Sequence, residues 1–320
     1  MKLVIMIPCL NEEETLPLVL ESLPKEIKGI DKIETLLIDD GSTDKTVEVA
    51  KSYGIDHIYH HARNKGLSLS FAAGIKESLR LGADVIVLTE GDNQYPQERI
   101  PDLIQPILDG KADVVIGDRQ THTIEHFSPA KKVLQRFGTK VVNVVAGSQV
   151  PDAISGFRAY SRNAAIQLNP IADYSWATET TIQASQKRQA IAILPIVTNP
   201  KLRDSRQFKS SWQHIRRSSK TIVRGFVMYK PYTVFLMIGT FFLVLGLIPF
   251  VHFAWLSITR QTGSVFGSHH LQSLIIGSVL LIASFISFTL GIIADQVRIN
   301  RLLLEDALEY LKKIQPTEKS

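Results

Sequence analysis

The chain is poor in cysteine, because Cys9 is the only one among its 320 residues. A single thiol excludes a disulfide framework and is typical of proteins kept in a reducing compartment. No histidine and asparagine accompany Cys9 in a nucleophile signature, so we expect it to pack and not to catalyse. The first eight residues are too short for a secretory signal and lead directly into a strand pattern, so no export signal is expected.

Two common nucleotide-binding signatures are missing as well. No G-x-G-x-x-G follows the first predicted strand, and G-x-x-x-x-G-K-[ST] occurs nowhere, which removes the main support for dinucleotide-binding and P-loop proteins. With 45% hydrophobic and 21% charged residues, the composition is that of a folded protein. The net charge of +5 does not call for nucleic acid as a partner, because the basic residues gather beside two apolar segments.

These apolar segments, 232–258 and 271–294, carry no formal charge. Each exceeds the roughly 20 residues that cross the hydrocarbon core of a bilayer. Core helices of soluble proteins are the alternative, but such helices seldom lack a polar face twice in succession. The sequence therefore predicts two membrane-spanning helices and a cell-membrane location.

Basic residues determine the expected orientation. They are frequent in 201–230 and again after the second span, whereas the loop 259–270 has only Arg260. Both termini are therefore expected on the cytoplasmic side. An amphipathic helix over 211–230 is expected either in the headgroup layer or packed on the preceding domain. The cytoplasmic tail, 295–320, is expected to form an amphipathic helix that serves self-association or the membrane surface.

Residues 1–210 alternate short apolar runs with helical patterns, which predicts an α/β domain whose mostly parallel sheet has helices on both faces. The predicted strands are 3–7, 33–38, 57–59, 85–88, 114–116 and 191–197. The predicted helices are 12–23, 43–53, 68–80, 97–108 and one near 131–146.

An acidic turn follows the predicted strand 85–88. It contains Glu90, Gly91, Asp92 and Gln94. Ligands of open α/β sheets collect beyond the carboxyl ends of the strands. Oxygen ligands at alternate positions suit Mg²⁺ or Mn²⁺, usually shared with the phosphates of a substrate. Taken alone, these residues also fit a polar turn without a ligand.

A second polar segment, 39–44, follows the predicted strand 33–38. Ser42 or Thr43 could cap the next helix, and the carboxylates Asp39 and Asp40 could bind a base or a ribose. A capped, solvated turn is the alternative for this segment.

Together, six segments resemble those of family 2 glycosyltransferases with the GT-A fold, in the same order. Among these enzymes the chain is most similar to polyprenyl-phosphate hexosyltransferases such as the dolichol-phosphate mannose synthases. The segments are 7–12, 39–44, 63–66 with 72–74, 90–94, 117–119 and 152–158.

The resemblance implies inverting, metal-dependent transfer of a hexose from a GDP- or UDP-sugar to dolichyl or polyprenyl phosphate at the cytoplasmic face. It implies a donor-nucleotide site made by Pro8, Leu10, Glu12, Ile38, Asp40 and Gly91. It implies Mg²⁺ or Mn²⁺ bound by Glu90, Asp92 and Gln94, and catalytic roles for Asp92, Asp152 and Arg119. The acceptor phosphate would meet Arg119, Ser155, Arg158, Lys201, Arg203 and Arg206. By family analogy, the chain would also form a homo-oligomer such as a tetramer.

The chain departs from the family in two places. Glu90 stands where the family commonly has aspartate, so its longer side chain would reach the ion directly or through water. The basic loop 201–206 lacks the usual glycine, which leaves open which of its cations meets the acceptor phosphate.

Three other functions make different demands on the sequence. A processive polysaccharide synthase would need a Gln-x-x-Arg-Trp motif and more membrane helices, and a nucleotidyltransferase would open with a glycine-rich basic loop; the chain has none of these. A non-catalytic membrane scaffold on a degenerate transferase fold remains as an alternative, although the acidic turn is present. Metal-dependent binding of the donor would separate a catalyst from such a scaffold.

Overall fold

The structure is a computed structural model that describes residues 1–120, 138–169 except 141, 145 and 148, 176–200, 227–259 and 268–314. The chain divides into two compact units. Met1–Ile222 and Glu305–Ser320 form the first unit, and Val223–Leu304 form the second. The described residues from Glu305 to Ile314, which lie within the expected tail 295–320, thus group with the first unit.

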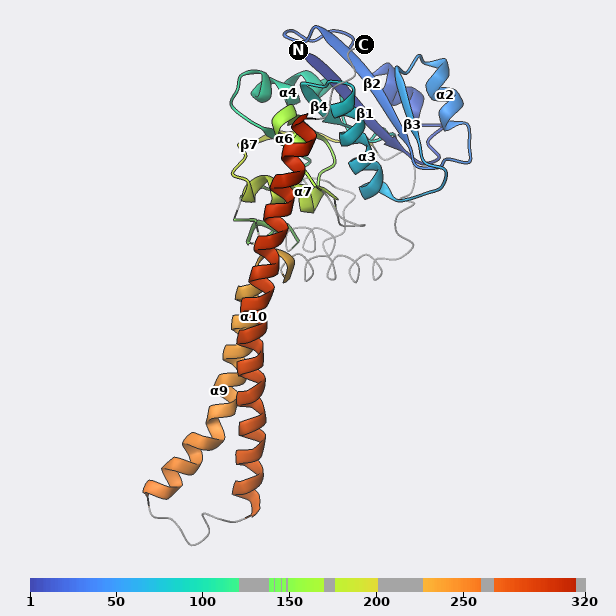
Figure 1. Cartoon of the computed structure of the whole chain (residues 1–320). Coiled ribbons are helices and arrows are strands. Elements are labelled where there is room, and N and C mark those ends of the chain that lie inside the picture. Colours follow the sequence, from blue (N-terminus) through green and yellow to red (C-terminus); the bar gives the residue numbers. More distant parts are fainter. Residues whose placement is uncertain are drawn as a thin grey trace. The chain divides into compact units, whose positions relative to one another are not determined.

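The first unit is built on a mixed seven-stranded sheet in the order β3-β2-β1-β4-β6-β5-β7 (Figure 1). Its strands are β1 (Lys2–Cys9), β2 (Lys32–Asp39), β3 (His57–His60), β4 (Val85–Leu88), β5 (Val114–Asp118), β6 (Arg158–Ser161) and β7 (Ile191–Pro195). All pairings are parallel except those of β6 with β4 and β5. The mostly parallel α/β fold is therefore confirmed, and β6 is the strand that the sequence analysis missed.

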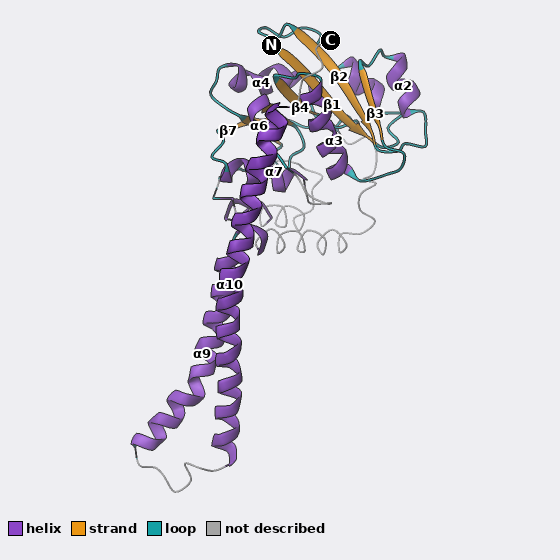
Figure 2. Ribbon diagram, in the orientation of Figure 1, coloured by secondary structure: helices purple, strands orange, loops and turns teal. Residues whose placement is uncertain are grey.

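Most helices of the first unit lie between its strands in sequence; Figure 2 draws the helices in purple and the strands in orange. They are α1 (Leu16–Glu21), α2 (Thr46–Ser52), α3 (Leu67–Arg80), η1 (Gln97–Arg99), α4 (Ile100–Leu108), α6 (Arg162–Gln167) and α7 (Trp176–Gln186). The helix expected near 131–146 is described only from residue 138 onward, where helical residues are found.

Strand β1 packs against helices on both faces of the sheet. Its successive side chains point to opposite faces, so each face receives every second residue. Leu3, Ile5 and Ile7 join a buried cluster with residues of α1 and α4. Met6 points to the other face, where a Cβ at Gly74 of α3 would lie 3.1 Å from its sulfur. A strand buried on both faces needs an unbroken apolar run, as is typical of parallel sheets.

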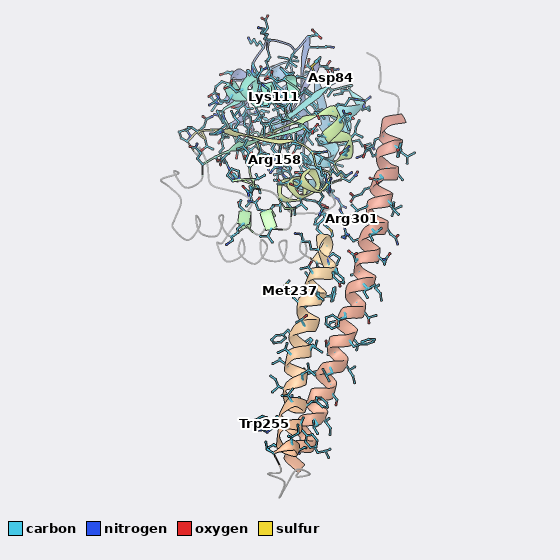
Figure 3. All side chains as sticks on the ribbon, turned by 90° about the vertical axis from the view of Figure 1, so that its left-hand side faces the viewer. Asp84, Lys111, Arg158, Met237, Trp255 and Arg301 are labelled. Atoms are coloured by element: carbon cyan, nitrogen blue, oxygen red, sulfur yellow. The ribbon has the colours of Figure 1, made fainter. Side chains whose placement is uncertain are left out.

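The second unit contains the two apolar helices, α9 (Pro231–Ile258) and the first part of α10 (Ser268–Ile314). Among the described residues, these are the helices long and apolar enough to cross a membrane, judged by length and composition. Only 11% and 22% of their most apolar windows are buried, in contrast to core helices of soluble proteins. Figure 3 labels Met237 and Trp255 on α9, which are 56% and 66% exposed.

Small residues let α9 and α10 approach closely. A Cβ on Gly246 would lie 3.0 Å from the carbonyl oxygen of Gly277, and a Cβ on Gly277 would lie 2.9 Å from that of Gly246. Nearby, Ser284 Oγ donates a hydrogen bond to the carbonyl of Gly239 at 2.8 Å. Packing through small residues is a common way for membrane helices to associate.

We therefore expect Gly246→Leu to separate the two helices and to destabilise the hairpin by about 1–3 kcal/mol through overpacking. Thermal unfolding in detergent would measure the loss. Ala254→Leu, at an exposed position of the same helix, is the matched control and should change little. Equal stability of the two variants would contradict this packing.

Candidate active site

The candidate site lies at the sheet edge where the parallel strands end. Strands β1, β2 and β4 all finish at this edge, and each is followed by a polar segment. Strand β6 runs in the opposite direction, so the turn that precedes it, 152–157, is brought to the same edge. This antiparallel strand explains why Gly156 lies against Glu90, which follows β4, and why Asp152 contacts Arg119, which follows β5.

On the donor side, Asp40 organises the loop that follows β3. Its two carboxylate oxygens accept hydrogen bonds from the backbone nitrogens of Lys65 and Gly66, both at 2.8 Å. Its own backbone nitrogen donates to Cys9 O at 2.9 Å. Asp40 is 5% exposed, so the described contacts make it a buried anchor of this loop. Contact with a nucleoside stays a prediction.

The segment after β1 is attached to its neighbours. Asn11 Oδ1 accepts from Thr43 N at 2.7 Å, and Glu12 N donates to Thr46 Oγ1 at 2.8 Å. The hydroxyl of Thr15 lies within hydrogen-bond distance of two acceptors, Glu12 Oε2 at 2.9 Å and the carbonyl of Gly91 at 2.8 Å, which share its single proton. The segments after β1, β2 and β4 are thereby joined into one surface.

The remaining predicted donor residues belong to the same edge. Pro8 and Ile38 are register partners on β1 and β2, and Ile38 is fully buried. Leu10, which directly follows β1, is half-buried. A Cβ on Gly91 would lie 2.5 Å from Cys9 Sγ, so only glycine fits there. Burial raises the pKa of the Cys9 thiol well above its ordinary value, which suits the expected packing role.

Hydrogen bonds hold the acidic turn in shape. Asp92 Oδ1 accepts from Gln94 N at 3.1 Å, and Asp92 Oδ2 accepts from Gln94 Nε2 at 2.5 Å. Asn199, four residues beyond β7, donates from Nδ2 to the carbonyls of Asn93 and Tyr95 at 3.1 and 3.2 Å. The sequence analysis did not identify Asn199, because no spacing links it to a turn a hundred residues earlier.

Glu90 and Asp92 fit a divalent cation that shares its ligands with a substrate. The part of the chain that the structure describes contains no group of three or more His, Cys, Asp or Glu able to hold a metal by itself. Magnesium and manganese sites of nucleotide enzymes often use one or two carboxylates, with phosphates and water as the other ligands. Gln94 donates to Asp92 here and so orients the carboxylate; its own ligation stays a prediction.

Glu90 also lies against the turn that precedes β6. A Cβ on Gly156 would overlap Glu90 Oε1 and would lie 3.1 Å from the Tyr95 hydroxyl. Gly156 N donates to this hydroxyl at 2.8 Å. Burial, and then the charge of Glu90, raise the pKa of Tyr95, so the phenol stays protonated. The close approach at Gly156 joins the acidic turn to the acceptor side.

The predicted acceptor side contains a partly buried ion pair between Arg119, just after β5, and Asp152. Arg119 Nε donates to Asp152 Oδ2 at 2.7 Å, and Arg119 Nη2 donates to Oδ1 at 3.0 Å. The side chains are 18% and 5% exposed. Burial would raise the pKa of Asp152, but the charge and hydrogen bonds of Arg119 outweigh it and lower this pKa. The pair is therefore fully charged near neutral pH.

Arg158 is fully buried at the start of β6 (Figure 3). Its nitrogens donate to the carbonyls of Ser155 and Ala153 at 2.8 and 2.9 Å and to the hydroxyls of Thr180 and Thr181, both at 3.0 Å. These contacts are internal, so the structure places Arg158 as a support of the turn 153–155. Direct contact with an acceptor phosphate stays a prediction for Arg158 and for Ser155.

Three predicted acceptor residues, Lys201, Arg203 and Arg206, lie outside the described residues, as does most of the expected amphipathic helix 211–230. The described part of the site therefore brings together the segments after β1, β2, β4 and β5 and the turn before β6. Such an arrangement can hold a metal diphosphate beside the partly buried Arg119.

Comparisons with known proteins show what the chain is similar to. Residues 4–168 match the family model described as glycosyl transferase family 2. The undecaprenyl-phosphate mannosyltransferase of Micrococcus luteus is 28% identical over 206 residues, which cover 61% of this chain and 83% of that protein. The dolichol-phosphate mannosyltransferase of Pyrococcus furiosus is 29% identical over 180 residues, 53% of this chain and 50% of that protein.

Solved structures share the fold. Glucosyl-3-phosphoglycerate synthase from Mycobacterium tuberculosis, in complex with uridine diphosphate, superposes with a TM-score of 0.54 at 21% identity. The superposition covers 70% of this chain and 79% of that chain. At this identity, the likeness concerns the fold alone.

Proposed function

The chain belongs to glycosyl transferase family 2, and from this premise we propose that it transfers a hexose from a GDP- or UDP-sugar to a polyprenyl or dolichyl phosphate. The observation that supports the proposal is the close approach of Glu90 to Gly156, because it brings the acidic turn next to the segment that contains Asp152, the partner of Arg119. Relatives named for transfer to undecaprenyl and dolichol phosphate support this acceptor class.

In this proposal, Glu90 and Asp92 hold a divalent cation at the donor diphosphate. Bound there, Mg²⁺ or Mn²⁺ would neutralise the charge that develops on the leaving nucleoside diphosphate. Structures of the same fold contain Mn²⁺ or Mg²⁺ together with uridine nucleotides, which supports this placement. Asp40 and the segment after β1 would receive the nucleoside.

The acceptor is a phosphate monoester, which is already anionic near neutral pH and needs little help from a general base. Its oxygen would attack the anomeric carbon from the face opposite the leaving group, so we expect inversion without a covalent enzyme intermediate. Arg119 and the cations of 201–206 would bind this phosphate, since guanidinium groups match phosphate oxygens well. Asp152 would keep the Arg119 side chain in position.

The two apolar helices would bring the site to a lipid acceptor. We propose that they span the membrane with both termini on the cytoplasmic side, because the basic residues flank the spans and are sparse in the connecting loop.

Incubating the full-length protein with single GDP- and UDP-sugars, polyprenyl phosphate and Mn²⁺ tests the proposal. We expect one donor to give a glycolipid whose mass equals the acceptor plus one hexosyl residue. Polyprenol without phosphate is the matched control and should give no product, because the attacking phosphate oxygen is missing. Absence of product with every donor in the panel would contradict the proposed function.

A further inference from the structure

The last turns of α10 are bonded to the first unit through a lysine. Lys312 Nζ donates to the backbone carbonyls of Ile166 and Leu168 at 3.0 and 2.9 Å and to Asn169 Oδ1 at 2.7 Å. Burial, and then repulsion from Lys187, lower the pKa of Lys312 to about 8. Near neutral pH it is therefore still mostly an ammonium group, whose three protons match three acceptors. The carbonyls belong to the end of α6, where a cation is favoured.

A glutamate one turn earlier on α10 makes a second attachment. Glu309 Oε1 accepts from Gln167 Nε2 at 3.2 Å, and Glu309 Oε2 lies 3.9 Å from Lys187 Nζ at the end of α7. Gln167 Oε1 in turn accepts from Gln189 Nε2 at 2.9 Å. Residues three apart share one face of a helix, so Glu309 and Lys312 engage the end of α6 and the end of α7 together.

From α6, hydrogen bonds continue to α7. Asn169, which accepts from Lys312, donates from its backbone nitrogen to Gln183 Oε1 at 2.9 Å and accepts from Gln183 Nε2 at its carbonyl at 2.8 Å. Gln183 lies on α7 and is 2% exposed. These two hydrogen bonds thereby connect the end of α6 to α7.

From α7, the contacts reach the acceptor side of the site. Thr180 and Thr181 of α7 accept from Arg158, whose other nitrogens hold the carbonyls of Ala153 and Ser155. Arg158 also stacks over the ring of Trp176, 5.4 Å from its centroid, at the start of α7. The turn held by Arg158 begins next to Asp152, the partner of Arg119.

We propose that Glu309 and Lys312 are positioning residues: the end of α10 clamps α6 to α7, and through α7 and Arg158 it holds the acceptor-side turn 152–155 in its productive shape. The role in acceptor binding rests on the proposed function, whereas the clamp itself does not. The same helix that supplies the second apolar segment would thus also tune the site that receives a lipid phosphate.

Lys312→Met and Glu309→Gln in the full-length protein test the clamp. Hydrogen–deuterium exchange in detergent should become faster in both 162–169 and 152–158, because the clamp no longer restrains them. Asp306→Asn is the matched control, since Asp306 is an exposed carboxylate on the same part of the helix. In transfer assays, we expect the KM for polyprenyl phosphate to rise about five- to tenfold, with the KM for the nucleotide sugar unchanged.

Two results would overturn the inference. Faster exchange confined to 162–169 would mean that the helix docks without positioning the turn 152–155. Equal rises in both KM values would mean a general loss of structure. If no donor supports transfer in the wild-type protein, the proposed function fails while the exchange data still decide on the clamp. Glu309→Gln keeps Lys312 intact, so it tests the inference even if Lys312→Met does not fold.

Discussion

Asp92→Ala is expected to lower sugar transfer by about a thousandfold or more. The variant removes one of the two carboxylates that can hold a divalent cation at the donor diphosphate, and loss of such charge stabilisation costs several kcal/mol in the transition state. Transfer of labelled hexose to polyprenyl phosphate measures the effect. Titration of the nucleotide with and without Mn²⁺ should show that metal-dependent binding is lost.

The control for this experiment is Asp102→Ala, which removes a carboxylate exposed on α4 and paired with Arg99. It should leave transfer and metal-dependent binding unchanged. Both variants should unfold near the temperature of the wild type, because Gln94, which donates to Asp92 from its backbone and its side chain, belongs to the same turn. Full activity of Asp92→Ala would show that the metal assignment is wrong and would favour the scaffold alternative.

Arg119→Met should produce the second large effect, on stability as well as on activity. It leaves the carboxylate of Asp152, which is 5% exposed, without its cation, and breaking a buried pair in this way typically costs about 3–5 kcal/mol. Thermal unfolding in detergent measures the loss. Transfer should also fall by at least about a hundredfold, because the turn 152–155 and the predicted phosphate contact are both disturbed.

A second substitution separates these two causes. Arg119→Met combined with Asp152→Asn removes the uncompensated charge, so part of the stability should return while transfer stays low. Arg99→Met is the matched control on an exposed pair and should cost less than about 1 kcal/mol. If the double variant were no more stable than Arg119→Met, the ion pair would not be the source of the loss.

The stability that the Arg119–Asp152 pair contributes should decrease in acid. The pKa of Asp152 is lowered in the folded protein, so its contribution to stability is fully present above the ordinary value of 3.8 and is lost as pH falls through the lowered value.

Strands with a continuous apolar run were predictable from the sequence. Strands β1 and β4 are such runs, and the polar residues that follow them, among them Glu90 and Asp92, were expected at the ligand-binding edge, where the structure places them. Strand β6 was missed because it is short and begins with Arg158, a residue that is rarely buried. Its burial depends on acceptors from α7 that no local pattern reveals.

The structure also shows contacts that the sequence did not suggest. Arg158, predicted to meet the acceptor phosphate, donates hydrogen bonds to Ala153, Ser155 and α7. Asn199, which is distant in sequence, donates hydrogen bonds to the backbone of the acidic turn. Both roles depend on hydrogen bonds between segments distant in sequence, and spacing carries no information about such contacts.

By itself, the sequence determined the α/β class, the family and the presence of two apolar helices, because periodicity, ordered motifs and hydropathy are local properties of the chain. The tertiary structure alone decided that β6 runs antiparallel and thereby turns Asp152 toward Arg119. It alone placed Lys312 on the end of α6. The physical reason is that a buried charge is tolerated only where distant segments supply its partners, and these partners are chosen by folding.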